Sequence, residues 1–430
     1  MKQPLRRLFL CAVCLALSPL HAGDAPLSIV ETTLLSTTGS TRATAYGMSH
    51  KIVTTPTQVV VGWLDQPAEI MVRAFNRQAR SWSPAQKVGT GMSNHAGPAL
   101  TKDSTGRIHL VFGPHHGPFT YRHTLRAGEI DKWSEPESFG FMGTYPSLVT
   151  GPDDTLHLTY RSSGSDPWRV LYQQRPAGGT WSEPLALFEN DVPGYMWTGH
   201  SLAVDAAGTL HVVFCLYEEE AKRGRAILYL RSPDGGSTWL ETAGAEMLLP
   251  VRAGDASTIL ADPTMDVRVK SMVLGPRQEP WFVTVHLGRP TRTVVLRSLE
   301  AGSWTEIDLL PHLQAVDPNR ELVDATMTFD RDGRLYVFAT TGGVGPEVTT
   351  FWGDPSNEVV LLVSADRGQT FSVLPVSVPD PTEPAWMPSI ERPLGPVPIG
   401  RPHLLYTRGG PGTGVHSPLT TEVHFITLGP

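Results

Sequence analysis

Four positions in the first half of the chain carry side chains that can do chemistry. They are Asn94–His95, His115–His116, Tyr145 and Arg161, and we expect each beside the end of a strand. Rigid scaffolds tend to place their working residues in such loops. Histidine and tyrosine can transfer protons, and arginine holds anions. A metal site is the competing interpretation of the histidines, but no tight ligand spacing such as H-E-x-x-H supports it.

Structural roles compete with functional ones at several of these positions. Tyr145 could plug a central channel, and Arg161 could pair with Asp166. Other histidines are expected to pack or hydrogen-bond within strands, because three of them recur at one position of a repeat. These histidines are His109, His157 and His211, and we interpret His123 and His403 in the same way.

A repeated unit of a turn followed by an apolar strand defines the expected fold. The unit occurs at residues 103–112, 151–160, 205–214 and 330–338. An aromatic residue follows each polar outer turn, at Trp82, Trp133, Trp181, Trp239, Trp304 and Phe371. The spacing of these aromatics fits a four-stranded blade, and no convincing amphipathic helix interrupts the pattern. The repeats therefore predict an all-β propeller.

Two outer turns match the Asp-box pattern S-x-D-x-G-x-T-[WF], at residues 232–239 and 364–371. An Asp box is a turn that hydrogen-bonds to itself, so it indicates the fold and says little about function.

The blades are expected to close into one ring of seven within a single domain, residues 23–430. Their expected starts lie near residues 43, 94, 144, 198, 266, 324 and 386. The last blade has only three evident strands, and residues 28–36 form a spare apolar strand that could supply its fourth. Such pairing would remove two open sheet edges. Six or eight blades remain alternatives, because residues 240–275 are irregular.

Blade geometry predicts which side chains share a face. The innermost strand begins, and the second strand ends, on the same side of the disc, where propellers bind ligands around the channel mouth. Residues expected at that mouth are Asn94, His95, His115, His116, Tyr145, Arg161, His200, Tyr217, His286, Arg289, Asp324 and Arg408.

The first residues predict export. Lys2, Arg6 and Arg7 precede an apolar run at 8–17, and small residues follow up to Ala22, as in a secretory signal peptide at residues 1–22. No later segment is apolar enough to span a membrane. We therefore expect a secreted or periplasmic protein that is not bound to a membrane. Cys215 alone would remain after cleavage, so no internal disulfide is expected.

Net charge narrows the range of ligands. The chain carries −7, and cleavage after Ala22 would remove three cations and leave −10. An acidic protein is a poor candidate for nucleic-acid binding. If the ligand is itself anionic, the positive charge that binds it must be local.

Several segments together resemble the BNR-repeat propeller family that contains ulvan lyases. They are residues 94–99, 112–122, 144–148 and 158–161, and the motif-bearing match covers residues 90–215. In those lyases, two histidines from one blade join a tyrosine and a following arginine at a fixed interval. The interval from Tyr145 to Arg161 coincides with that of the family, and His95 with either His115 or His116 fits the histidine pair. The doubled histidine leaves the second position open, and the His-x-x-Pro pattern favours His115.

The resemblance implies β-elimination on a 4-linked uronic acid, with ulvan-like rhamnose-glucuronate or rhamnose-iduronate linkages as substrate. Arg161 would neutralise the carboxylate, His95 and Tyr145 would be base and acid in an order left open, and His115 would hold the carboxylate or orient the base. No cofactor would be required, and a monomer is expected. The substrate-binding residues would be His116, Asn94, His200, Tyr217 and Arg289.

Two other functions stay open. A sialidase-like glycoside hydrolase also fits Asp-box propellers, but residues 40–60 lack an Arg-Ile-Pro segment, and the expected face has few acids for hydrolysis. A non-catalytic carbohydrate-binding propeller would be favoured if Tyr145 and Arg161 did not share a pocket with His95.

Overall fold

The computed structural model describes residues 27–195, 199–218, 223–262, 264–288, 291–344, 352–395, 397–412 and 419–430. The expected signal segment 1–22, residue Arg289 and the side chain of Tyr217 lie outside this description.

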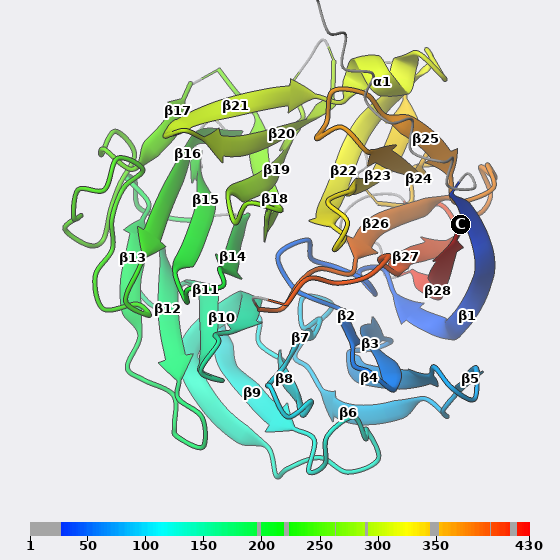
Figure 1. Ribbon diagram of the computed structural model, residues 1–430, viewed down its shortest axis with the longest axis horizontal. Helices are drawn as coiled ribbons and strands as arrows, with labels where there is room; N and C mark the ends of the chain where they lie inside the picture. The colour runs from blue at the N-terminus through cyan, green and yellow to red at the C-terminus, as the bar shows by residue number, and fades with distance from the viewer. Residues whose placement is uncertain are drawn as a thin grey trace, which may run out of the picture.

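Antiparallel strands form seven blades around a ring (Figure 1). Blades 1 to 3 come from the first half of the chain. Blade 1 contains β2 (Ile52–Thr54), β3 (Gln58–Asp65), β4 (Glu69–Asn76), β5 (Ser81–Trp82) and β6 (Gln86–Thr90). Blade 2 contains β7 (Ala99–Lys102), β8 (Ile108–Phe112), β9 (Gly117–His123) and the start of β10 (Glu137–Thr150), and blade 3 contains the rest of β10, β11 (Leu156–Ser162), β12 (Arg169–Arg175) and β13 (Leu185–Glu189).

The second half of the chain supplies the other four blades. Blade 4 contains β14 (His200–Val204), β15 (Leu210–Glu218), β16 (Arg223–Ser232) and β17 (Thr258–Ala261), and blade 5 contains β18 (Val267–Leu274), β19 (Pro280–His286), β20 (Thr293–Glu300) and β21 (Ser303–Asp308). Blade 6 contains β22 (Arg320–Phe329), β23 (Leu335–Gly343), β24 (Glu358–Ser364) and β25 (Ser372–Pro375). Blade 7 contains β26 (Ala385–Ile390), β27 (Leu404–Gly409), β28 (Thr420–Gly429) and β1 (Ser28–Ser40). A short helix, α1 (Leu310–Gln314), links blades 5 and 6. In the described part of the chain no helix has the length and apolarity needed to cross a membrane.

The N-terminal strand closes the ring. β1 pairs antiparallel with β28, from Ser28 opposite Gly429 to Ser40 opposite Thr420. One further pair, Gly39 with Asp65 of β3, joins the last blade to the first. The prediction of seven blades completed by an N-terminal strand is confirmed, so six and eight blades are excluded.

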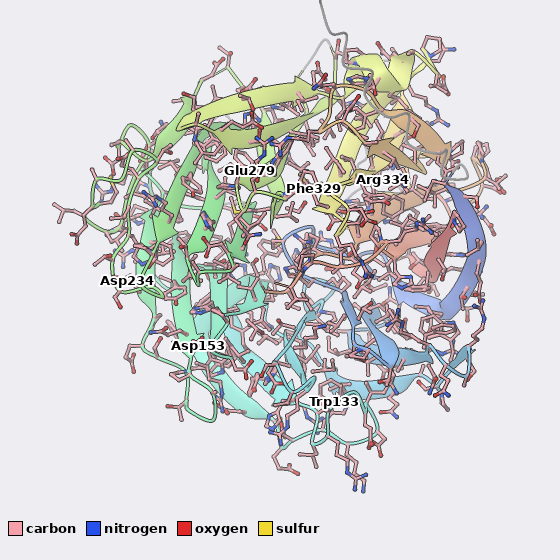
Figure 2. All side chains as sticks on the ribbon, viewed as in Figure 1. Trp133, Asp153, Asp234, Glu279, Phe329 and Arg334 are labelled. Carbon is pink, nitrogen blue, oxygen red and sulfur yellow. The ribbon has the colours of Figure 1, made fainter. Side chains whose placement is uncertain are left out.

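Aromatic and apolar side chains fill the spaces between blades. Trp239 is 1% exposed and packs edge-on against Tyr172 of the preceding blade, with ring centres 5.4 Å apart. In the Asp box at the outer rim, the hydroxyls of Ser232 and Thr238 donate to Asp234, each at 2.8 Å (Figure 2). The outer aromatics therefore join neighbouring blades, as the repeat predicts.

The three repeating histidines have the structural role expected of them. His109, His157 and His211 each place Nδ1 2.7 Å from a tyrosine hydroxyl on the next strand of the same blade: Tyr121, Tyr172 and Tyr229. One pair per blade satisfies two buried polar groups at once.

The closing strand offers a matched test of this architecture. Leu35 is 6% exposed and packs in the core between the last and first blades, whereas its neighbour Leu34 is 43% exposed. We expect Leu35→Ala to lower the free energy of unfolding by about 2–4 kcal/mol, because it leaves a cavity. Leu34→Ala should change it by less than about 0.5 kcal/mol. Denaturant unfolding measures both, and equal effects would contradict the closure.

Candidate functional site

The candidate residues lie on the face where inner strands begin and second strands end. His95 precedes β7, the His115–His116 pair lies between β8 and β9, Tyr145 lies within β10, and Arg161 lies near the end of β11. Blade geometry thus brings together residues that are far apart in the sequence.

The backbone is unusual at two of these positions. Tyr145 and His116 have φ angles of 61° and 65°, in the left-handed region that residues other than glycine rarely adopt. At Tyr145 the pairing of β10 with β11 shifts register between Thr144 and Ser147. Each such residue costs about 1–3 kcal/mol, and residues of this kind concentrate at functional sites. The irregularity at Tyr145 occurs where β10 passes from blade 2 to blade 3.

Three histidines form a continuous stack. The rings of His95 and His115 are nearly parallel, with centres 3.8 Å apart, and His116 follows His115 at 4.4 Å. The ring of Tyr145 lies 6.0 Å from that of His95, and the Arg161 guanidinium carbon lies 4.6 Å from the centre of the Tyr145 ring. The structure therefore places His95, His115, His116, Tyr145 and Arg161 in one cluster.

Arg42, which the sequence analysis missed, contacts this cluster directly. Its Nη1 donates to Nε2 of His95 and, at 2.5 Å, to the hydroxyl of Tyr46. Because arginine is only a donor, a hydrogen bond here needs the tautomer of His95 that has its lone pair on Nε2. Its proton is then on Nδ1, which lies 3.3 Å from the hydroxyl of Ser93.

Aromatic residues from two sides complete the surroundings of Arg42. Its guanidinium carbon lies 4.4 Å from the ring centre of Trp352, a residue of the loop between β23 and β24. Tyr46 meets Tyr145 edge to face at 4.6 Å, and burial raises the pKa of Tyr46 well above its usual value. Tyr46 therefore remains a neutral phenol. No sequence motif marks Arg42, which lies just ahead of the first inner strand.

The neighbouring histidines are also held neutral. Burial, followed by His116 and the two guanidinium groups, lowers the pKa of His115 to about 4. Burial and then Arg161 lower the pKa of His116. At neutral pH these rings therefore have lone pairs available to accept protons, while the positive charge of the cluster resides on Arg42 and Arg161.

Arg161 lies beneath an aromatic cover. The side chain has no exposed area, and its guanidinium carbon is 4.9 Å from the ring centre of Trp168 and 5.5 Å from that of Tyr195. The Tyr195 hydroxyl accepts from Nη1 at 3.5 Å. The loop that carries Tyr195 is held by Asp166, which accepts from the Gly194 N–H at 2.7 Å. A ligand can therefore reach Arg161 only if this cover moves.

His200 lies below the site and not at its surface. The side chain is fully buried, Nε2 is 3.2 Å from the Thr159 carbonyl, and burial lowers its pKa to about 4. The expectation that His200 binds substrate is therefore wrong, because packing of blade 4 against blade 3 covers it. Asn94 is partly exposed beside His95.

Three other residues expected on this face have partners of their own. Lys270 lies 2.9 Å from Asp324, the Thr284 hydroxyl lies 3.2 Å from His286, and Arg408 donates to the Glu383 carbonyl at 3.1 Å. Over the described residues, no group of three or more histidine, cysteine or acidic side chains could hold a metal ion.

Comparison with known proteins supports the fold and the family. The model of the BNR repeat-containing family matches residues 59–274, half of the chain. The ulvan lyase of Nonlabens ulvanivorans is 24% identical over 145 residues, which are 28% of this chain and 31% of that protein. The ulvan lyase of Alteromonas sp. (strain LOR) is 22% identical over 161 residues, 30% and 33% of the two chains. The matched segments thus span about a third of these curated relatives.

Solved structures agree over most of the chain. A PL25 ulvan lyase bound to -[GlcA(1-4)Rha3S]- aligns with a TM-score of 0.70 and 12% identity, covering 91% of this chain and 95% of that chain. Polysaccharide lyase Uly1 aligns with a TM-score of 0.59 and 13% identity, covering 93% and 99%. At such identities the likeness shows a shared fold. Because the family model matches half of its residues, this seven-bladed propeller belongs to the BNR repeat-containing family.

Proposed function

We propose that this protein is a polysaccharide lyase that cleaves a uronic-acid-containing chain by β-elimination. The observation that carries the proposal is the cluster of neutral histidines beside Tyr145, with Arg42 and Arg161 on either side. The similarity to ulvan lyases agrees with this chemistry.

The reaction needs a neutralised carboxylate and two proton-transfer groups. The C5 proton of a uronate becomes acidic enough to remove only when a cation stabilises the charge that develops on the adjacent carboxylate. Arg42, and Arg161 once its aromatic cover moves, supply two guanidinium groups of the kind that hold a carboxylate through two parallel hydrogen bonds. His115, half-buried and neutral, can orient the base or share the carboxylate.

We assign His95 as the base and Tyr145 as the acid. In the free protein Arg42 occupies the lone pair of His95 Nε2. When the substrate carboxylate takes over Arg42, that lone pair becomes available for the C5 proton. The C4–O4 bond then breaks, a C4–C5 double bond forms, and the departing O4 takes the Tyr145 proton. Solvent then takes the proton from His95 and returns a proton to Tyr145.

The substrate we propose is an ulvan-like polymer with rhamnose and glucuronate or iduronate linkages. The related PL25 enzyme was solved with -[GlcA(1-4)Rha3S]-. Glucuronate-rich plant gums with rhamnosyl linkages would satisfy the same site. The chain would meet such polymers outside the cell, in accord with the signal-like residues 1–22.

A non-catalytic carbohydrate-binding propeller is the second candidate. The specific observation in its favour is the aromatic cover over Arg161, which has no exposed area. Aromatic rings at a rim also suit the apolar faces of sugars. The two functions differ in whether an unsaturated product forms.

The hydroxyl of Tyr145 is the proposed proton donor to the departing O4. Tyr145→Phe should lower lyase activity by about 10²–10⁴-fold, because it removes a proton-transfer group, and leave the thermal midpoint nearly unchanged. Tyr121→Phe is the matched control: it should retain activity but cost about 1 kcal/mol of stability, since its hydroxyl serves His109. Activity is measured as the rise in ultraviolet absorbance from the new double bond, with ulvan or a glucuronate gum as substrate.

The outcomes separate the candidate functions. New reducing ends without that absorbance would indicate a hydrolase. Polymer binding with neither signal would indicate a binding propeller. Equal activity in Tyr145→Phe and the native protein would remove Tyr145 from the mechanism.

A second prediction concerns pH. The lowered pKa keeps His115 neutral from alkaline pH down to about 4, so its charged form should appear only below the usual histidine range. Since Arg161 contributes to this shift, Arg161→Met should raise the pKa of His115. Nuclear magnetic resonance titration of the His115 ring measures it, with His115→Asn to assign the signal. A native His115 that titrates at its ordinary value would refute the neutral-cluster description.

A further inference from the structure

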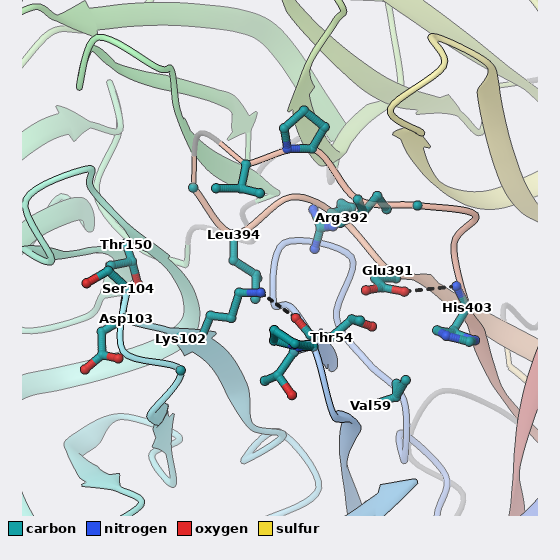
Figure 3. Close-up of a pocket in the computed structure, with 18 of the residues that line it drawn as sticks. Thr54, Val59, Lys102, Asp103, Ser104, Thr150, Glu391, Arg392, Leu394 and His403 are labelled. Atoms are coloured by element: carbon teal, nitrogen blue, oxygen red, sulfur yellow. Dashed lines mark hydrogen bonds between the residues drawn. The ribbon is translucent and has the colours of Figure 1, made fainter. Parts of the chain in front are cut away.

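A second cavity opens on the face opposite the histidine cluster. It has a volume of about 870 Å³ and lies between blade 1, the hairpin turns of blades 2 and 3, and residues 391–395 and 397–403 that follow β26 (Figure 3). β7 links the two regions, because His95 precedes its first residue and Lys102, its last residue, lines the cavity. The cavity therefore belongs to a site separate from the proposed active site.

The lining of this cavity is cationic although the whole chain is acidic. Its charged lining residues are six cations and three carboxylates: Arg77, Arg80, Lys102, Arg331, Arg392 and Arg401; Asp103, Asp154 and Glu391.

The carboxylates already have partners. Asp103 accepts from the Thr105 hydroxyl at 2.7 Å, and Asp154 accepts from the backbone and hydroxyl of Ser104, both at 2.6 Å. Glu391 accepts from the His403 N–H at 3.2 Å. With six cations against three carboxylates, the charged lining residues carry an excess of positive charge.

Arg392 is the group that most needs a partner. The residue is 2% exposed, and its Nε and Nη1 are buried without a hydrogen-bond partner among the described residues. Figure 3 shows its guanidinium directed into the cavity, toward the side where Lys102 and Thr54 lie. A buried charge of this kind is normally paired or hydrogen-bonded, because desolvation costs several kcal/mol.

His50 and Lys51 lie near Arg392 and supply no negative charge to pair with it. Burial, followed by repulsion from Arg392, lowers the pKa of His50 and of Lys51. Burial alone lowers the pKa of Arg392 to about 9. His50 is 3% exposed, and both of its ring nitrogens lack hydrogen-bond partners among the described residues. A bound anion would stabilise the guanidinium through charge-assisted hydrogen bonds.

We infer that this cavity binds an oxyanion, a carboxylate or a sulfate, through the guanidinium of Arg392 with Lys102 as a second cation. Guanidinium groups hold such planar or tetrahedral anions through paired hydrogen bonds. The Lys102 ammonium donates to the Thr54 carbonyl, and both residues line the cavity. The volume is within the range of small-molecule sites, so the anion can be free or part of an acidic saccharide. The inference does not depend on lyase activity.

The test is binding of sodium sulfate and of sodium glucuronate to the full chain, measured by calorimetry and by the shift of the thermal midpoint. Arg392→Met should weaken binding of the preferred probe at least about tenfold, because it removes charged hydrogen bonds. Leu34→Ala, at an exposed position of the closing strand, is the control and should bind that probe as the native protein does. Glucuronate that competes with sulfate would identify a saccharide acid group as ligand, and binding of sulfate alone would identify a free ion.

Loss of binding in Arg392→Met is informative only if this variant folds, so its stability is measured as well. Arg392→Met removes an uncompensated buried charge, so its thermal midpoint in anion-poor buffer should equal or exceed that of the native protein. If this variant does not fold, Lys102→Met is measured in its place, with a smaller loss expected. Failure of both probes to bind the native chain, or unchanged affinity in the folded variants, would overturn the inference.

Discussion

The antiparallel pairing of β1 with β28 is the constraint on which the rest of the structure depends. It joins the two ends of the described chain, supplies the outer strand of the last blade, and holds the first and last blades against each other. An open ring would leave two sheet edges unpaired. Arg42, which follows β1 directly, contacts His95 of blade 2. Closure therefore serves both the fold and the candidate site.

The chain carries a net negative charge, but positive charge is concentrated at particular places within the closed ring. At the histidine cluster, Arg42 and Arg161 pack against neutral aromatic rings. Burial and these same cations keep His115 and His116 neutral. Cations beside neutral imidazoles are the combination that the proposed β-elimination of an acidic sugar needs.

The two faces of the ring use the same strands differently. His95 precedes β7 and Tyr145 begins the blade-3 part of β10, and the turns that follow these two strands border the cationic cavity. Arg392 shows the contrast with Arg161: both are buried, but Arg161 is enclosed by aromatic rings, whereas Arg392 faces open volume. The proposed active site and the proposed anion site thus lie on opposite faces of the ring.

The sequence by itself determined the blades, because each repeat must bury its own strands and its outer aromatic against a neighbour. The same periodicity assigned His109, His157 and His211 to the scaffold, and the interval from Tyr145 to Arg161 marked one part of the cluster. Tertiary structure alone decided the rest. Arg42, Trp168, Tyr195 and Trp352 come from loops without a shared pattern, and only ring closure and loop packing bring them together. Burial of His200 likewise follows from contact between two blades, a property that no local spacing of residues encodes.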